Sequence, residues 1–216
     1  MNPIVPDAVA QMWVDAHRHL LETPGPLAAL VASHGLLARV PQTDRSRALV
    51  WAIVGQQLST RAASTIRSRL DERLGPRPLA SAIDDLADAD LLACGLSNAK
   101  VRSVRDLVSR VRDGTLAPDQ FDPMPDDEIR RLLVAVRGIG PWTADMFLIF
   151  SMCRPDVLAT TDLGIQVAVG RLTGLSRKAT PAEVMLAAET GQWHPYASAA
   201  CLHLWRSLDG PAAMDP

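Results

Sequence analysis

Residues 132–162 contain a glycine turn between two apolar helical segments, followed by a single carboxylate. The segment reads LLVAVRGIGPWTADMFLIFSMCRPDVLATTD, in which the turn is Gly138-Ile139-Gly140 and the carboxylate is Asp162. Glycine adopts positive φ angles without steric cost, so the two glycines allow a tight turn between helices. The first backbone N–H groups of the second helix lack intrahelical partners and form an anion site that suits a phosphate. The pattern predicts a protein that holds a nucleic-acid strand and acts beside it.

The rest of the chain has the apolar periodicity of amphipathic helices. Apolar residues recur at three- and four-residue steps in residues 101–111 and again in residues 129–136. Three acidic residues at positions 126–128 suit the first turn of the second of these helices. We find neither sustained strand alternation nor an internal repeat. The sequence therefore predicts an all-α fold.

Composition limits the class of protein and its cofactors. Hydrophobic residues make up 48% of the 216 residues, which is typical of a globular chain. No apolar run is long enough to span a membrane and the N-terminus lacks signal-peptide features, so we expect a cytoplasmic protein, associated with the nucleoid and not with a membrane. Cys94, Cys153 and Cys201 are too widely separated for a disulfide framework, a zinc site or an iron–sulfur cluster. We expect that no cofactor is required.

The charge distribution bears on nucleic-acid binding in two ways. The net charge of −2 does not indicate a partner with a phosphate backbone. Residues 45–112, however, contain twelve basic and seven acidic residues, which leaves a local charge of about +5. A locally basic lobe can bind DNA although acidic residues elsewhere cancel the total. Most of these arginines also fit the simpler interpretation of solvated helix faces.

Three further blocks of sequence accompany the glycine turn and the Trp142-Thr143-Ala144 segment that follows it. They are TTDLGI around Asp162, VGQQLS at residues 54–59, and the segment from Trp193-His194-Pro195-Tyr196 to Leu204-Trp205. Together the blocks resemble the helix-hairpin-helix/GPD superfamily of DNA glycosylases, and within it the alkylpurine branch typified by bacterial 3-methyladenine DNA glycosylase II. The resemblance runs from about Arg45 to Trp205, nearly the whole chain.

This resemblance implies a two-lobed helical architecture with the active site in the cleft between the lobes. The chain would form a single glycosylase unit over residues 1–216. Its central lobe would comprise about residues 43–155, with the hairpin at 137–141, and its second lobe residues 1–42 and 156–216. Only about forty residues precede Thr43, too few for the additional N-terminal α/β domain of longer bacterial relatives.

The function implied by the resemblance is excision of alkylated purines, such as 3-methyladenine and 7-methylguanine, in base excision repair. The enzyme would be a monomer that flips the damaged base out of double-stranded DNA and hydrolyses its N-glycosidic bond. Two alternatives remain open at this point. One is a glycosylase for other damaged bases, either oxidised or mismatched. The other is a non-catalytic helix-hairpin-helix protein that only binds DNA, for which neither Asp162 nor the Gln-Gln loop is needed.

The resemblance also assigns catalytic and base-binding residues. Asp162 matches the family's catalytic aspartate, whose negative charge stabilises an oxocarbenium-like transition state, and its position also suits a helix N-cap. Trp142 stands where bifunctional relatives carry a Schiff-base lysine, which predicts an enzyme without abasic-site lyase activity. Trp142 and Tyr196 would line the base pocket, although core packing is an equally good interpretation of Trp142. Ala197 departs from the arginine often found at its position and suggests a more open pocket.

The remaining assignments concern contacts with DNA. Gln57 is the candidate wedge that fills the gap left by the extruded nucleotide, in place of the apolar residue of the alkylpurine relative, whereas Gln56 is expected to tie loop backbone together. Lys100 matches a frequent family lysine that is either structural or phosphate-facing. The phosphate would be bound by backbone N–H groups of Gly138, Gly140, Trp142 and Thr143. The carbonyls of Val134, Val136 and Gly138 would hold Na⁺ or K⁺.

Overall fold

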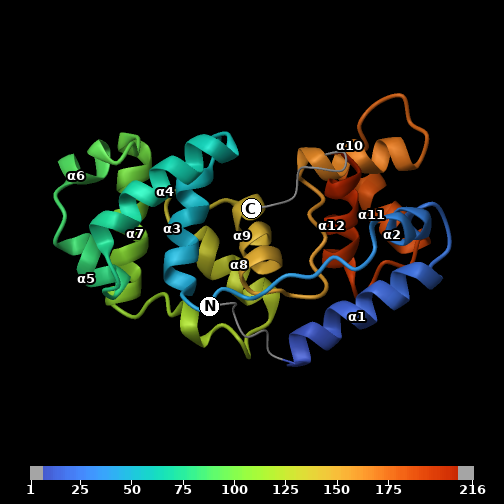
Figure 1. The fold of residues 1–216 in the computed structure, drawn as a ribbon, viewed down its shortest axis with the longest axis horizontal. Helices are drawn as coiled ribbons and strands as arrows, with labels where there is room; N and C mark the ends of the chain where they lie inside the picture. Colours follow the sequence, from blue (N-terminus) through green and yellow to red (C-terminus); the bar gives the residue numbers. More distant parts are fainter. Residues whose placement is uncertain (1–6, 209–216) are drawn as a thin grey trace. The chain divides into compact units, whose positions relative to one another are not determined.

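The structure, a computed structural model, describes residues 7–208 (Figure 1) and divides the chain into two compact units. One unit comprises residues 42–147, and the other comprises residues 1–41 and 148–216. No strand occurs between residues 7 and 208, so the prediction of an all-α fold is confirmed. The lobe boundary predicted from the sequence lies near residue 155, and the division between these two units falls after Phe147.

The unit of residues 42–147 is built around the amphipathic helix α7. Its helices are α3 (Arg45–Gly55), α4 (Thr60–Leu74), α5 (Leu79–Asp84), α6 (Asp88–Ala93), α7 (Asn98–Arg112), the 3-10 turn η1 (Pro118–Gln120), α8 (Asp126–Val134) and α9 (Pro141–Met146). The predicted apolar stripe of α7 is buried and packs against α3, α5 and α6. Helix α3 in turn contacts α4 and α9. This packing places the loop after α3 and the turn before α9 in one rigid unit.

The second unit surrounds helix α12. It contains α1 (Asp7–Glu22), α2 (Leu27–His34), α10 (Leu163–Leu172), α11 (Pro181–Thr190) and α12 (Ala197–Leu208). Every residue of α12 from Ala197 to Leu204 is buried, because the helix packs against α1, α2 and α10. The π-helical turn η2 (Phe147–Ser151) leads from α9 into this unit. No helix between residues 7 and 208 is both long and apolar enough to cross a membrane.

Candidate functional site

Asp162 is the N-cap of α10, as its sequence position suggested. Its Oδ1 atom accepts a hydrogen bond from the backbone N–H of Ile165 at 2.9 Å, the usual geometry of a capping aspartate. The same oxygen accepts a second hydrogen bond, from the indole N–H of Trp205 at 2.8 Å. The two donors fix the orientation of the carboxylate, because rotation about its last torsion would break both bonds.

Trp205 was not among the candidate site residues, although it closes the C-terminal sequence block. The sequence contained one signal for it, namely a glycine two residues after Asp162. Gly164 lies where a side chain would meet both the aspartate and the indole ring. A tryptophan and an aspartate that are 43 positions apart in sequence give no local spacing from which their contact could be inferred.

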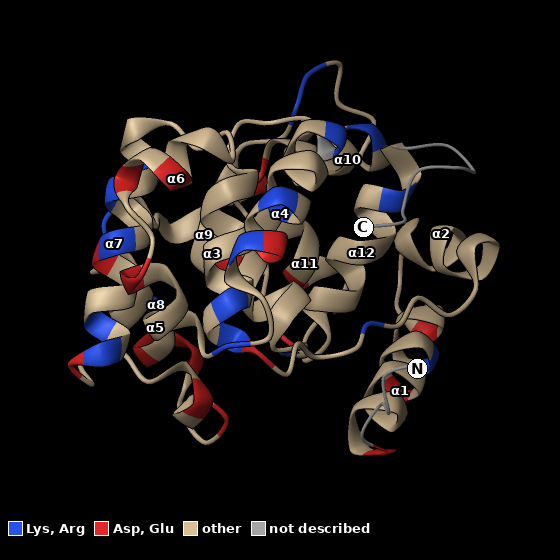
Figure 2. Ribbon diagram, turned by 60° about the vertical axis from the view of Figure 1, so that its left-hand side comes forward, with Lys and Arg blue, Asp and Glu red and all other residues tan. Residues whose placement is uncertain are grey.

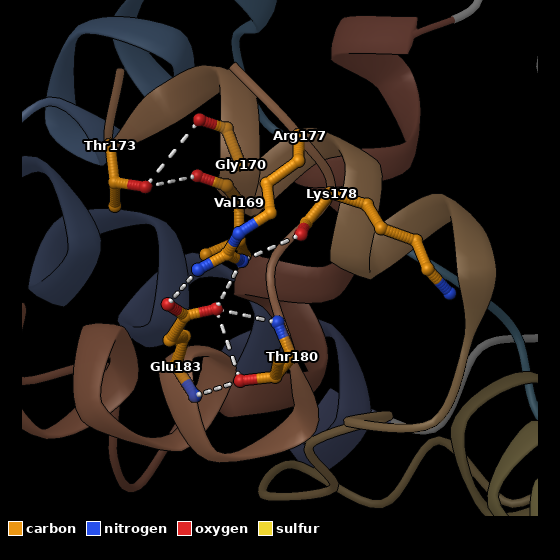
Figure 3. Close-up of polar contacts among 7 residues, drawn as sticks. All are labelled: Val169, Gly170, Thr173, Arg177, Lys178, Thr180 and Glu183. Atoms are coloured by element: carbon orange, nitrogen blue, oxygen red, sulfur yellow. Dashed lines mark hydrogen bonds and ion pairs between the residues drawn. The ribbon is translucent and has the colours of Figure 1, made fainter. Parts of the chain in front are cut away.

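The loop between α10 and α11 is fastened to the first turn of α11. Figure 3 shows the Arg177 guanidinium facing the carboxylate of Glu183, with both nitrogen–oxygen distances at 2.8 Å. Glu183 also accepts from the backbone N–H of Thr180 and so completes a capping box at the start of α11. The hydrogen bond from Arg177 lowers the pKa of Glu183 to about 2, so the Glu183 carboxylate of this ion pair stays ionised at neutral pH. The same loop is joined to α10, because the backbone N–H of Ala179 donates to the carbonyl of Gln166 at 2.8 Å.

Tyr196, the predicted pocket aromatic, precedes α12 and lies against α1. Its ring meets the His19 ring edge-on, with the centroids 5.3 Å apart. No hydrogen bond joins Tyr196 to Asp162 among the described residues. Trp205, which does bond Asp162, is nine residues further along the chain, or about 13 Å along a helix axis. Ala197 is fully buried and donates its backbone N–H to Asp156.

The hairpin occupies the turn between α8 and α9, at the predicted position. Gly138 has a φ of +78°, which favours glycine, and a Cβ atom there would lie 2.4 Å from the Ser103 hydroxyl. Gly140 has an ordinary φ of −99°, and no atom lies within 4 Å of its Cβ position. Only the first of the two glycines is therefore required by local geometry.

The turn is held from α7 and from within its own pair of helices. Asp106 of α7 accepts a hydrogen bond from the backbone N–H of Arg137 at 2.8 Å and another from the Arg110 side chain. Burial alone would raise the pKa of Asp106, but these hydrogen bonds outweigh it and lower that pKa below its ordinary value. Arg130 of α8 also bonds Asp145 of α9 at 2.8 Å, which ties the two helices together. Neither aspartate was identified from the sequence.

Some of the hairpin N–H groups are available to a phosphate and some are not. The N–H of Ile139 is used within the turn, where it donates to Val136, and Pro141 has no N–H. The N–H groups of Gly138, Gly140 and Thr143 donate to no acceptor within residues 7–208. The turn thus presents several donors beside the N-terminus of α9, an arrangement suited to an anion.

The carbonyls predicted to hold a monovalent cation fit that role in their chemistry. The Val136 carbonyl accepts from Ile139, and the Gly138 carbonyl accepts from the Gln56 side chain at 2.8 Å. Each oxygen retains a second lone pair, and no hydrogen bond to the Val134 carbonyl occurs within residues 7–208. Three oxygen atoms are therefore available for Na⁺ or K⁺, and the cation stays a prediction.

The Gln-Gln loop connects α3 to α4 beside the hairpin. The Gln56 side chain donates to the Gly138 carbonyl and to the Thr143 hydroxyl, so it ties this loop to the hairpin as expected. Lys100 donates its ammonium group to the carbonyls of Val54 and Gln56 at 2.7 and 2.8 Å. Burial lowers the pKa of Lys100 below its ordinary value. Of its two interpretations, these bonds identify a structural lysine.

The predicted wedge and the hairpin tryptophan are both accessible. Gln57 has a φ of +57° and is exposed, between the end of α3 and the N-cap of α4. Trp142, in the first turn of α9, is 42% exposed, which argues against the core-packing interpretation. Both residues belong to the unit of residues 42–147, whereas Asp162, Tyr196 and Trp205 belong to the other.

Comparison with known proteins identifies the family. The sequence pattern of the HhH-GPD superfamily of base excision DNA repair proteins matches residues 50–192. The chain belongs to this superfamily. A Bacillus subtilis (strain 168) relative, YfjP, is 30% identical over 206 residues, which are 91% of this chain and 71% of the relative. Some relatives are longer, and the chain spans 36% of the length of one from Mycobacterium tuberculosis.

Two solved structures are similar over most of the chain. The first is the crystal structure of a DNA-3-methyladenine glycosidase from Bacillus halodurans, with a TM-score of 0.80 and 28% identity over 90% of this chain and 89% of that one. The second is the Schizosaccharomyces pombe 3-methyladenine DNA glycosylase Mag1 in complex with abasic DNA. Its TM-score is 0.80, with 27% identity over 89% of this chain and 96% of that one.

The HhH-GPD pattern covers the Gln-Gln loop, the hairpin and Asp162, but it ends before Tyr196 and Trp205. The described residues contain no group of three or more His, Cys, Asp and Glu side chains that suits a metal ion. All three cysteines are buried and none forms a disulfide bond, and burial raises the pKa of Cys153 to about 11. The expectation that no cofactor is required stays a prediction.

Proposed function

We propose that this protein is a monofunctional DNA glycosylase that flips out and excises alkylated purines of the 3-methyladenine and 7-methylguanine type. It would act as a monomer on double-stranded DNA, within base excision repair. The observation that carries the proposal is the Asp162 carboxylate, held by two N–H donors at the start of α10 in an HhH-GPD chain. Similar proteins are named for 3-methyladenine, and one of them is bound to abasic DNA.

The chemistry needs a fixed negative charge beside the sugar. The bond between C1′ and the base nitrogen breaks, and its electron pair leaves with the base. Positive charge develops on the sugar, and the Asp162 carboxylate stabilises it. Water then adds its oxygen to C1′ and releases one proton. An alkylated purine that already carries positive charge leaves as a neutral base, so one carboxylate is sufficient.

Residues of the other unit would bind the DNA. The free N–H groups of Gly138, Gly140 and Thr143, with that of Trp142, would bind a backbone phosphate. The Gly138 carbonyl and its neighbours Val134 and Val136 would hold a monovalent cation that supplies positive charge next to this phosphate. Gln57 would enter the minor groove, and Trp142 would contact the flipped base together with Tyr196 of the unit that carries Asp162.

Excision of methylated purines from a panel of modified duplexes tests this proposal. We expect release of 3-methyladenine and 7-methylguanine by the wild type. Asp162→Asn should abolish release but leave duplex binding largely intact, because the charge acts on the transition state. Near wild-type single-turnover rates in that variant would show that Asp162 is not catalytic. Duplex binding without excision of any base would indicate a module that only binds DNA.

The absence of lyase activity has its own test. Trp142 stands where bifunctional relatives have a lysine, and tryptophan cannot form an imine. We expect an intact abasic strand as the product and no covalent protein–DNA adduct after borohydride treatment. A clear adduct would show that another amine performs lyase chemistry.

A further inference from the structure

The hydrogen bond between Trp205 and Asp162 depends on the absence of a side chain at position 164. A Cβ atom on Gly164 would lie 3.0 Å from Oδ1 of Asp162, 3.0 Å from Cδ1 of Trp205 and 3.2 Å from its Nε1. These separations are tighter than ordinary van der Waals contact, so even a methyl group would press on both partners. Gly164 has no positive φ that would require glycine. The close approach of the indole is therefore the steric reason for a glycine in this turn.

The indole of Trp205 also lies against a second ring, which in turn contacts a cation. The Phe150 ring, in the π-helical turn η2, lies 5.3 Å from the Trp205 ring with the planes tilted by 32°. The Arg39 guanidinium lies over the Phe150 ring, 5.0 Å from its centroid, in cation–π geometry. The indole thus approaches Gly164 and contacts the Phe150 ring, with its N–H directed at Asp162.

This support extends to the N-terminal helices. The backbone carbonyl of Arg39 accepts a hydrogen bond from the indole N–H of Trp13 at 2.9 Å. Trp13 is 1% exposed in the core of α1. A continuous series of contacts therefore joins α1 to the carboxylate, through Arg39, Phe150 and Trp205, and all of it lies within one unit.

We propose that Trp205 is a positioning residue for Asp162, with Gly164 providing the space for its approach and Phe150 and Arg39 holding its ring. An indole has one N–H donor, no acceptor and few rotamers, so it fixes a carboxylate oxygen at little entropic cost. Because the Ile165 N–H binds the same oxygen, the two donors together fix the direction of the second carboxylate oxygen. This role in catalysis rests on the proposed glycosylase function.

Trp205→Phe tests the proposal, because it keeps an aromatic ring beside Phe150 and removes only the N–H donor. We expect the single-turnover excision rate to fall by about 10- to 100-fold, the range of a hydrogen bond to a charged group. Affinity for an abasic-analogue duplex should change by less than about twofold, since the bond orients a reacting group. Trp51→Phe in α3 of the other unit is the matched control and should retain the wild-type rate.

Gly164→Ala separates positioning from folding. Alanine favours a helix more than glycine does, which offsets part of the cost of displacing the indole, so the melting temperature of this variant should stay close to that of the wild type. Its excision rate should nevertheless fall several-fold, because the methyl group separates Trp205 from Asp162. If Trp205 had only a structural role, Trp205→Phe would lower the melting temperature, the affinity for the abasic-analogue duplex and the excision rate together. Wild-type rates in both variants would overturn the proposal.

A measurement without substrate tests the contact itself. The chain has five tryptophans, so an NH-correlated NMR spectrum should show five indole cross-peaks. The cross-peak that disappears in Trp205→Phe should be the one that shifts most in Asp162→Ala, and it should exchange slowly with solvent. An unchanged cross-peak would overturn the proposal whatever the rates are. A wild type that excises no base would instead overturn the proposed function, and the catalytic role of Trp205 with it, while the cross-peak still reports the bond.

Discussion

The two hairpin glycines look equivalent in the sequence, but they differ in what surrounds them. Gly138 combines a positive φ with a close approach to Ser103, whereas Gly140 has neither constraint. The difference arises because α7 passes directly behind Gly138. One glycine is required by the fold, and the other leaves its backbone open to a ligand.

We expect Gly138→Ala to lower the free energy of unfolding by about 2 kcal/mol, from left-handed strain and the contact with Ser103. Gly140→Ala should change it by less than about 0.5 kcal/mol. Urea denaturation of both variants measures the difference. Adding Ser103→Ala to Gly138→Ala should restore part of the loss by removing the nearest atom. Equal stabilities of Gly138→Ala and Gly140→Ala would contradict this account of the turn.

At the level of elements, the hairpin turn is held in place by three sets of side-chain hydrogen bonds. Asp106 holds its backbone from α7, Gln56 holds it from the loop after α3, and Arg130 joins α8 to α9. Its N–H groups are therefore preorganised before any ligand binds, which reduces the entropic cost of binding a phosphate. The affinity of such a site depends on backbone access more than on added charge.

Gly140→Arg separates access from charge. Because nothing lies within 4 Å of the Cβ position, the variant should fold with a melting temperature close to that of the wild type. We expect it to bind an abasic-analogue duplex about tenfold more weakly, since the side chain blocks the approach of the phosphate to the backbone. Simple electrostatic attraction between the added positive charge and the DNA would instead predict tighter binding with a steeper salt dependence. A well-folded variant that binds more tightly would exclude phosphate binding by the hairpin backbone.

Helices α2 and α12 are joined by a pair of histidines. Nδ1 of His34 lies 3.2 Å from Nδ1 of His203, and the two rings are nearly parallel. Burial, with the nearby His34 and His17, lowers the pKa of His203 to about 3, and burial with Arg206 lowers the pKa of His34. Protonation of both rings would place two positive charges in contact, so at least one ring of this pair stays neutral in the folded state.

This pair predicts a loss of stability in mild acid. An unfolded histidine binds its proton below about pH 6.5, whereas folded His203 resists protonation until about pH 3. Between these values the unfolded state binds more protons, so stability falls with falling pH, by up to about 1.4 kcal/mol per pH unit. Urea denaturation between pH 5 and 6.5 should show a smaller slope for His203→Gln than for the wild type. Identical slopes would show that His203 is protonated alike in both states.

For the whole molecule, the positive charge available to DNA is smaller than the sequence count indicates. Seven arginines of residues 45–112 form ion pairs with aspartates: Arg45, Arg47, Arg73, Arg77, Arg105, Arg110 and Arg112. Figure 2 shows basic and acidic segments close together on these helices. Arg61 and Arg69 form no ion pair within residues 7–208, and they line a shallow groove of about 430 Å³ along α4. Helix α4 begins directly after the Gln-Gln loop, which carries the candidate wedge Gln57. These two arginines are therefore the best candidates for contacts with phosphate.

We expect Arg61→Ala and Arg69→Ala each to weaken duplex binding and to reduce the slope of log affinity against log salt by about 1, the effect of one lost phosphate contact. Arg73→Ala on the same helix is the matched control, because Arg73 already pairs with Asp90. Binding titrations at several salt concentrations measure the slopes. The assignment fails if the control reduces the slope as much as the other two variants do.

The helical fold, the family and the candidate residues that are local in the chain could all be predicted from the sequence. Apolar periodicity predicted the buried stripe of α7, and the position of Asp162 before an apolar run predicted its role as an N-cap. Helix periodicity and capping involve residues only a few positions apart. Such features can therefore be read directly from the sequence.

The side chains that hold these residues in place could be identified only from the folded structure. Three hydrogen-bond contacts each join segments at least 31 residues apart in the sequence: Trp205 with Asp162, Asp106 with the hairpin backbone, and Lys100 with the Gln-Gln loop. Tryptophan, aspartate and lysine occupy helix faces for many reasons, so their identity does not reveal the partner. The partner follows from how whole helices pack, and packing is set by the summed burial of many apolar side chains rather than by any local pattern.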